Sequence, residues 1–223
     1  MLRDVLRFVI SGLYKLLTRL EISGLENVPE KGSFILAVNH LSRLDPPLVY
    51  VLLKRKDITG LAADKYKKNP FFRWIVEAVD AIWINREEAD FHAMREALKY
   101  LETGGILGIA PEGTRSTTGG LINTKTGVAY LAGKANVPIL PCAIYGTEQA
   151  LKKLLHLQRP TIRVMFGKLF VLPTIDRRNR DGSLRKNTDE IMCQIAAMLP
   201  VDYRGVYSGH PRLRELLTNS RTI

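Results

Sequence analysis

The sequence predicts one layered α/β domain, with a mostly parallel central sheet flanked by helices and preceded by an amphipathic N-terminal helix. Short apolar runs that are typical of buried strands alternate with segments that have the apolar spacing of helices. The length of 223 residues suits one domain, and 46% apolar and 25% charged residues are ordinary values for a globular protein. Strands that alternate with helices favour parallel pairing, which is the basis of the predicted sheet.

The individual elements follow from the same patterns. The predicted strands are residues 33–38, 81–85, 106–110, 138–145 and 161–166. The predicted helices are residues 45–53, 70–78, 88–102, 126–135 and 188–199. Asp45 and Pro46 favour a helix start, because Asp is a good N-cap and Pro fits the first helical turn. We therefore expect an α/β domain over residues 21–200, followed by a basic C-terminal tail over residues 201–223.

Residues 1–20 predict an amphipathic helix. Its leucines and Val9 form one broad apolar face, and its basic residues, including Arg3 and Arg7, cluster on another. The longest uncharged stretch, residues 8–14, is shorter than the roughly 20 apolar residues that span a bilayer, and no signal-peptide cleavage site is present. The pattern fits a helix in the membrane interface with its basic groups over anionic headgroups, and equally a helix packed on the domain's own core.

The chain is strongly basic, with 33 Lys and Arg residues, 22 Asp and Glu residues and a formal net charge of +11. This excess predicts a polyanionic partner, which is a nucleic acid, an anionic membrane surface or a phosphorylated substrate. The arginine-rich run at residues 177–186 predicts a solvated loop, and alternatively a contact with anionic lipid or an acidic acyl donor. Cys142 and Cys193 stand in apolar runs without metal-ligand spacing, so we expect buried thiols, a reducing compartment and no metal site.

His40 and Asp45 are the first candidates for chemistry. His40 follows the predicted strand 33–38, and α/β proteins carry functional groups on the loops after such strands. If the loop turned the Asp45 carboxylate back to the imidazole, it would fix the tautomer of His40 and stabilise its protonated form. Such a pair is a general base, whose nucleophile can be a hydroxyl of the substrate. The alternative is that Asp45 only caps a helix and that His40 is structural.

The segment Ala-Pro-Glu-Gly-Thr-Arg-Ser at residues 110–116 is the second candidate. It follows the predicted strand 106–110, and its proline and glycine predict an irregular turn. Backbone N–H groups and the side chains of Thr114 and Arg115 can converge there on an anion, and a planar guanidinium suits phosphate. The alternative is a polar surface turn in which Glu112 and Arg115 form an ion pair.

Two further cations occupy comparable positions. Arg86 follows the predicted strand 81–85, and Lys65 lies in a predicted loop. Each taken alone fits a solvated surface residue. Together with His40 and Asp45, these cations match the arrangement of a base beside a phosphate-binding site.

Five motifs in order resemble those of the 1-acylglycerol-3-phosphate acyltransferase family, the glycerophospholipid acyltransferases. They are Asn-His-x4-Asp at Asn39, His40 and Asp45, the Arg-ended strand at residues 84–86, Pro-Glu-Gly-Thr-Arg-Ser at residues 111–116, Lys-x-Gly at Lys125 and Gly127, and the proline-containing strand at residues 137–141. The resemblance extends from about residue 24 to residue 170. Two positions depart from the pattern, since Ala110 stands where Phe is common and Asn85 where Asp is frequent.

The resemblance implies transfer of a fatty acyl group from a thioester to the sn-2 hydroxyl of 1-acylglycerol-3-phosphate, which gives phosphatidic acid. His40 would deprotonate that hydroxyl and Asp45 would orient His40. Glu112 and Gly113 would help to position the glycerol part of the acceptor. The cations that would bind its phosphate are Arg115, Arg86, Lys65 and, as a further contributor, Lys125. No cofactor or metal is implied, because acyl-CoA or an acylated carrier protein serves as co-substrate.

The resemblance also implies partners and a location. The partners are an anionic membrane surface, a lysophospholipid acceptor and an acyl-CoA or acyl-carrier-protein donor, with no nucleic acid. The location is the cytoplasmic face of the membrane, with peripheral or monotopic attachment. Related enzymes that use glycerol-3-phosphate, another lysophospholipid or a glycolipid are alternatives. A basic nucleic-acid-binding domain is another, and it predicts a clustered basic face with exposed aromatics and no recessed His–Asp pair. A catalytically silent lipid-binding protein is the third, and the intact His40 and Asp45 argue against it.

Overall fold

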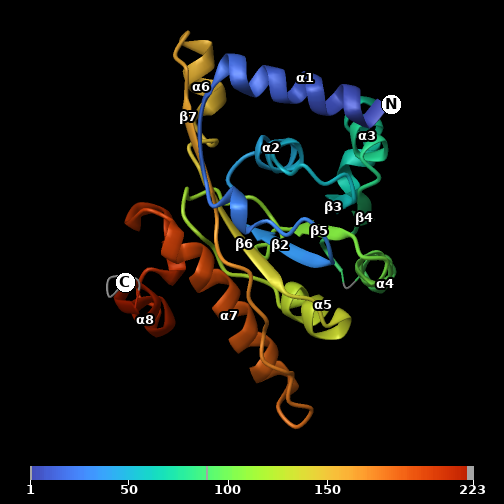
Figure 1. The fold of residues 1–223 in the computed structure, drawn as a ribbon, viewed down its shortest axis with the longest axis vertical. Helices are drawn as coiled ribbons and strands as arrows, with labels where there is room; N and C mark the ends of the chain where they lie inside the picture. The colour runs from blue at the N-terminus through green and yellow to red at the C-terminus, as the bar shows by residue number, and fades with distance from the viewer. Residues whose placement is uncertain (1, 89, 220–223) are drawn as a thin grey trace.

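The computed structural model describes residues 2–88 and 90–219, which form one seven-stranded sheet with helices on both faces (Figure 1). The strands are β1 (Arg19–Ser23), β2 (Phe34–Val38), β3 (Ile58–Ala63), β4 (Ile82–Ile84), β5 (Ile106–Ile109), β6 (Ile139–Tyr145) and β7 (Thr161–Phe166). The α-helices are α1 (Leu2–Leu17), α2 (Asp45–Leu52), α3 (Pro70–Ala78), α4 (Phe91–Glu102), α5 (Gly127–Ala135), α6 (Ala150–Leu155), α7 (Arg180–Met198) and α8 (Pro211–Asn219). Short 3-10 helices are η1 (Leu25–Asn27), η2 (Asp64–Lys68), η3 (Val201–Tyr203) and η4 (Gly205–Tyr207).

The strand order in the sheet is β1-β7-β6-β2-β5-β3-β4. All neighbouring pairs are parallel except β6 and β7, so the predicted mostly parallel sheet is confirmed. As a result, β6, β2, β5, β3 and β4 present their carboxyl ends at one common edge of the sheet. Loops at such an edge are where open α/β sheets bind their ligands.

Apolar side chains of the central strands fill two cores, one on each face of the sheet. Along β2, Ile35 and Ala37 point into a core that α4, α5, α7 and α8 cover, whereas Phe34 and Leu36 point into the core under α1, α2 and α6. This alternation follows from the two-residue period of a strand. It explains why β2 reads as an unbroken apolar run, since both of its faces are buried.

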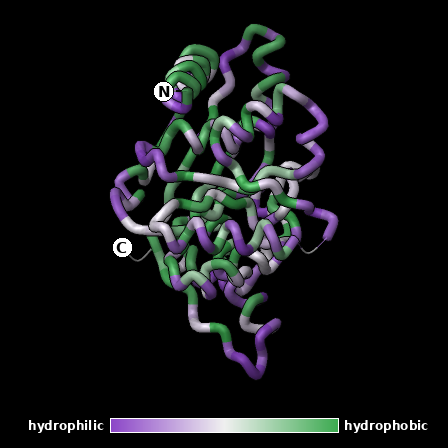
Figure 2. The backbone as a smooth tube through the Cα atoms, turned by 90° about the vertical axis from the view of Figure 1, so that its right-hand side faces the viewer, coloured by the Kyte–Doolittle hydropathy of each residue, from purple (hydrophilic) through white to green (hydrophobic). Residues whose placement is uncertain are grey.

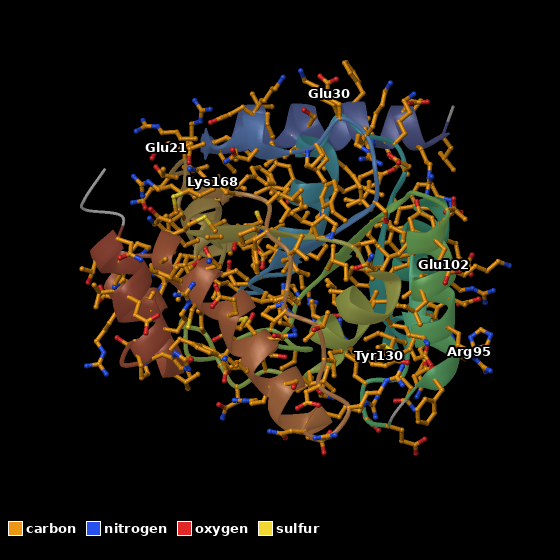
Figure 3. The ribbon with its side chains drawn as sticks, turned by 60° about the horizontal axis from the view of Figure 1, so that its bottom comes forward. Glu21, Glu30, Arg95, Glu102, Tyr130 and Lys168 are labelled. Carbon is orange, nitrogen blue, oxygen red and sulfur yellow. The ribbon has the colours of Figure 1, made fainter. Side chains whose placement is uncertain are left out.

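Helix α4 shows how a helix is fitted to this sheet. Ala93, Ala97 and Leu101 lie one turn apart and are buried against the sheet, while Arg95 and Glu102 point outward (Figure 3). The helix begins at Phe91 rather than at the predicted residue 88, because the Asp90 side chain caps it by accepting the Ala93 N–H at 2.9 Å.

Four elements, β1, β3, α6 and α8, were not predicted, and one helix, α7, is longer than predicted. β1 is an exposed edge strand and β3 contains a glycine, so neither reads as a buried apolar run, and α6 has only six residues. α7 starts at Arg180, capped by Asn179, so the prediction of a loop over residues 177–186 is wrong for most of that segment. At the chain ends, β1 brings residues 19–23 into the sheet, and α8 packs on α7 with Leu213 buried.

Helix α1 carries its apolar face outward and its arginines inward. Arg3 donates to the carbonyl of Ala78 and pairs with Asp80. Arg7 donates to the carbonyls of Leu53 and Arg55, in both cases at 2.7 Å, and its guanidinium lies 4.3 Å from the centre of the Tyr50 ring. The prediction that all the basic residues of this helix lie over headgroups is therefore wrong for Arg3 and Arg7.

The opposite face of α1 has no cover in the part of the chain that the structure describes. Phe8 and Leu16 are 81% and 71% exposed, and the rest of this apolar face consists of Leu2, Val5, Val9 and Leu13. Figure 2 shows α1 as a largely hydrophobic rod at one end of the molecule. The alternative that the helix packs on the domain's own core holds for its other side, where Tyr14 is buried and Ile10 packs against the core, but not for this exposed apolar face. None of the helices within residues 2–88 and 90–219 has the length and apolar character needed to cross a bilayer.

Candidate active site

The predicted site residues meet at the carboxyl edge of the parallel strands. His40 follows β2, Lys65 follows β3, Arg86 follows β4, and Glu112 and Arg115 follow β5. These strands are neighbours in the sheet, so the sheet order brings together side chains that are up to 75 positions apart in the chain. The order of the strands in the sheet therefore assembles the site, as expected for an open parallel sheet.

His40 and Asp45 form a hydrogen-bonded pair, with 2.9 Å between His40 Nδ1 and Asp45 Oδ2. The same carboxylate oxygen accepts the backbone N–H groups of Leu41 at 2.7 Å and Ser42 at 2.6 Å. α2 is capped at Leu44 without a side-chain bond, so the alternative that Asp45 only caps the helix is wrong. With Nδ1 donating to Asp45, Nε2 of His40 is the acceptor nitrogen, and it has no partner among the described residues.

Thr147 completes the surroundings of the Asp45 carboxylate, and it belongs to none of the motifs that the sequence contains. Its hydroxyl donates to Asp45 Oδ1 at 2.5 Å, and both side chains are buried. Thr147 follows β6, the strand next to β2, after Gly146, which has a φ of 90°. A polar residue just past the end of a parallel strand is the one signal that could have pointed to it.

Asn39 explains how the chain leaves the sheet just before His40. Its side-chain amide donates to the carbonyl of Ile144 and accepts the Ile144 N–H, both at 2.8 Å. The amide thus stands in for a peptide group in the ladder between β2 and β6. The backbone of His40 is released from the sheet while Ile144, on the neighbouring strand, stays fully bonded.

The turn after β5 holds the backbone of His40 on both sides. The His40 N–H donates to Glu112 Oε2 at 2.6 Å, and the Ser116 N–H donates to the His40 carbonyl at 2.8 Å. Glu112 Oε1 also accepts the Ile122 N–H at 3.3 Å, so its carboxylate bonds to backbone groups and the predicted surface ion pair with Arg115 is wrong. Direct contact of Glu112 with the acceptor stays a prediction.

Burial determines the titration of Glu112. Removal from water raises the pKa of this carboxyl group to about 7, against the opposing effect of the two N–H donors from His40 and Ile122. The nearby charge of Asp45 adds to the increase. Glu112 therefore changes its charge near neutral pH while it is bonded to the backbone of the candidate base.

The cations converge beside this turn. Burial lowers the pKa of Arg86, the nearby Tyr66 raises it, and the like charge of Arg115 lowers it, which indicates that the two guanidinium groups are neighbours. Lys125 Nζ donates to the Arg86 carbonyl at 2.9 Å, and Lys65 Nζ lies 5.7 Å from the centre of the Tyr66 ring.

None of these four cations has a carboxylate partner among the described residues. Asp64, the acid next to Lys65, pairs with Lys67 instead, at 2.8 Å. Like charges that gather without counter-ions favour the binding of an anion.

Gly113 allows the turn to pass close to Lys125. Its φ of 67° lies in the left-handed region, and a Cβ there would come within 3.4 Å of the Lys125 side chain. Thr114 is exposed at the apex of the turn, so its predicted contact with substrate stays a prediction. The described residues contain no group of three or more His, Cys, Asp or Glu side chains that could hold a metal ion. Cys142 and Cys193 are free and buried, as predicted.

Comparison with known proteins agrees with the motifs. The acyltransferase family model matches residues 19–145. A 1-acyl-sn-glycerol-3-phosphate acyltransferase of Borreliella burgdorferi is 31% identical over 129 residues, which are 57% of this chain and 51% of that protein. A protein of Mycoplasma pneumoniae named as a probable enzyme of the same type is 27% identical over 166 residues, which are 72% of this chain and 62% of that protein.

A solved structure has the same fold. The 1-acyl-sn-glycerophosphate acyltransferase PlsC from Thermotoga maritima superposes with a TM-score of 0.65 at 24% identity, over 85% of this chain and 76% of that chain. The chain spans between about half and three fifths of the length of the curated relatives that it matches first. The family match covers more than half of the chain and contains the His40, Arg86 and Glu112 motifs. The chain therefore belongs to the acyltransferase family.

Proposed function

We propose that this protein transfers a fatty acyl group from a thioester to the sn-2 hydroxyl of 1-acylglycerol-3-phosphate. One observation carries the proposal: the turn after β5 bonds to both the N–H and the carbonyl of His40, so that the His40–Asp45 pair lies beside cations that have no carboxylate partner in the described part of the chain. The two curated relatives described above are named as a 1-acyl-sn-glycerol-3-phosphate acyltransferase and a probable one. A base beside a phosphate-binding site is what this reaction requires.

The proposed chemistry uses His40 as general base and then as general acid. Nε2 accepts the proton of the sn-2 hydroxyl as its oxygen attacks the thioester carbonyl. When the tetrahedral intermediate collapses, the carbon–sulfur bond breaks and the imidazolium returns the proton to the leaving thiolate. Asp45 holds Nδ1–H and stabilises the imidazolium, since its own carboxylate is fixed by Leu41, Ser42 and Thr147.

The cations supply recognition of the acceptor. Lys65 comes from η2, Arg86 from the loop after β4, and Arg115 and Lys125 from the loop between β5 and α5. These cations would bind the phosphate of the acceptor with charge-assisted hydrogen bonds. The turn after β5 carries Arg115 and also bonds to the backbone of His40, so it would set the distance between the bound phosphate and the base. Gly113 would help to position the glycerol part, because its left-handed backbone, with a φ of 67°, disfavours a side chain at this position.

The proposal includes an anionic membrane surface on the cytoplasmic side as a partner. The outward apolar face of α1 supports it, because a soluble surface rarely carries such a contiguous patch. We expect Leu16→Asp to weaken binding to lipid vesicles about a hundredfold, since it removes a leucine that the bilayer would bury and puts a charge in its place. Val171→Asp is the matched control, because Val171 is 73% exposed but lies outside α1, next to Phe170, which bridges Ile139 at the start of β6. Equal binding by wild type and Leu16→Asp would count against the membrane contact.

The activity is tested with purified protein and two substrate panels. One panel varies the acceptor among 1-acylglycerol-3-phosphate, glycerol-3-phosphate, other lysophospholipids and a glycolipid, and the other compares acyl-CoA with acyl-carrier protein. We expect His40→Ala to lower kcat by about a hundredfold to ten-thousandfold with the fold intact, which is the usual contribution of a general base. Wild-type turnover by this variant would remove His40 from the mechanism, and a preference for another acceptor would change the assigned substrate.

The nucleic-acid hypothesis is not supported by a comparable observation. That hypothesis predicts that the protein lacks a recessed His–Asp pair. The His40 side chain, however, is only 12% exposed and is bonded to the buried carboxylate of Asp45.

A further inference from the structure

We propose that the α6 tip, residues 150–160, is a second membrane-contacting element that enters an anionic bilayer beside α1. The proposal rests on the proposed function in one respect, which is that lipid lies at this end of the molecule. It goes further by assigning a lipid contact to a segment outside all the motifs. The observations that carry it are the exposure, backbone conformation, charge and position of the α6 tip.

The apolar side chains of the α6 tip point away from the protein. Leu151, Leu155 and Leu157 are 60%, 84% and 97% exposed. Leu157 also has a φ of 55°, a left-handed conformation that disfavours a leucine and favours glycine or asparagine. Neither packing nor backbone geometry within the folded chain therefore accounts for a leucine at this position. Entry of the side chain into a bilayer accounts for it.

The charge of the α6 tip suits anionic lipid. Residues 150–160 contain Lys152, Lys153 and Arg159 and no Asp or Glu, and all three cationic residues are exposed. Each cation close to an anionic membrane strengthens binding by about fivefold. Exposed leucines flanked by cationic residues are the composition of a segment that inserts into the membrane interface.

The α6 tip and α1 form one end of the molecule. Figures 1 and 2 both show them together at the end opposite the start of α7. Arg159 Nη2 donates to the carbonyls of Lys15 at 3.0 Å and Thr18 at 2.9 Å, which fixes the α6 tip to the end of α1. A six-residue helix is about 9 Å long, which is comparable to the depth of about 5–10 Å that interfacial helices reach.

Insertion of the α6 tip would bring lipid to the active-site edge. α6 begins shortly after Thr147, whose hydroxyl holds Asp45. Lys153 of α6 and Gly146, the neighbour of Thr147, both line a cavity of about 400 Å³ at the foot of the helix. A bilayer around the leucines would thus lie next to the edge where the acceptor is expected to bind.

The test is binding of the full chain to vesicles of phosphatidylcholine with and without phosphatidylglycerol, measured by co-sedimentation. The variant is Leu155→Asn together with Leu157→Asn, because asparagine suits the left-handed backbone at residue 157 and the fold is retained. We expect binding to both vesicle types to weaken by about tenfold to a hundredfold. Val171→Asn, an apolar-to-amide change at an exposed residue outside α1 and the α6 tip, should bind like wild type.

A charge variant tests the second half of the proposal. Lys152→Glu together with Lys153→Glu should remove most of the extra affinity for vesicles that contain phosphatidylglycerol and should leave binding to phosphatidylcholine nearly unchanged. Circular dichroism of each variant confirms that the chain is folded.

Two outcomes overturn the proposal. One is wild-type vesicle binding by the leucine variant, and the other is a wild-type dimer in analytical ultracentrifugation that this variant abolishes without a change in vesicle binding. The second outcome would assign the α6 tip to contact between copies of the chain. Turnover of wild type with a short-chain acceptor in solution is measured separately. Its absence would refute the proposed function, whereas the α6 tip is judged by vesicle binding alone.

Discussion

Replacing Thr147 with valine removes one hydroxyl from the Asp45 carboxylate and keeps nearly the same side-chain shape. Asp45 has four donors, and three of them, His40 Nδ1 and the N–H groups of Leu41 and Ser42, bind Oδ2. Thr147 is the donor to Oδ1 among the described residues. The substitution therefore leaves a buried, charged oxygen without a partner, and the carboxylate gains freedom to rotate away from His40.

The magnitude follows from the charge of the acceptor. A hydrogen bond to a charged group contributes about 1.5–3 kcal/mol, and every 1.4 kcal/mol corresponds to about a factor of ten in rate. If the loss falls on the orientation of His40, kcat should decrease by about tenfold to a hundredfold. The KM for the acceptor should change less than about twofold, because Thr147 does not contact the cations at Arg86 and Arg115.

The assay is initial-rate kinetics with the acceptor varied at saturating donor, together with urea unfolding. Thr147→Ser is the matched control, because it keeps the hydroxyl and should retain most of the wild-type kcat. A folded Thr147→Val protein with wild-type kcat would refute the reasoning. So would equal losses in the Ser and Val variants, since the hydroxyl would then not be the group that matters.

Three further perturbations have defined outcomes. Glu112 has a pKa raised to about 7 in the folded chain, so the folded state binds its proton more tightly than the unfolded state, and the free energy of unfolding should fall by about 3 kcal/mol as pH rises from about 4.5 to 7. Urea titrations at pH 5 and pH 8 should show this decrease in wild type, and Glu112→Gln should lack it. Arg7→Ala should lower stability by about 2–4 kcal/mol, because it removes two bonds to backbone carbonyls and the contact with Tyr50, whereas Lys15→Ala in the same helix should have little effect in thermal unfolding. Arg115→Ala should raise the KM for a phosphorylated acceptor about tenfold with little change in kcat, and an unchanged KM in steady-state kinetics would remove Arg115 from the phosphate site.

The central part of the fold could be read from the sequence because buried parallel strands are continuous apolar runs. β2, β5 and β6 have both faces covered, so each gives such a run, and the polar residues that follow them lie at the site edge. Helices such as α4 are visible through their apolar spacing. The polar and cationic residues after the predicted strands, including His40, Arg86 and Arg115, are therefore predicted to share one edge of the sheet.

The remainder depends on contacts between distant residues. The pattern of apolar residues in α1 defines two faces of the helix but does not show which face packs on the domain. The structure shows that the face with Arg3 and Arg7 does, because both side chains donate to backbone carbonyls of other segments. Thr147 meets Asp45 across 102 positions of the chain, and no local pattern encodes such a pair. β1 is exposed on most residues, so its pairing with β7 leaves no apolar signature.

The side chain of Asn39 decides where regular structure ends and irregular backbone begins. A primary amide has a donor nitrogen and an acceptor oxygen, and Ile144 bonds to both of them. Aspartate would present two oxygens to that carbonyl and N–H, and leucine would present neither group, so the position tolerates few alternatives. The first residue of the Asn-His-x4-Asp motif can therefore be understood as a terminator of the β-ladder, selected for what it does to its neighbour's backbone rather than for any contact with substrate.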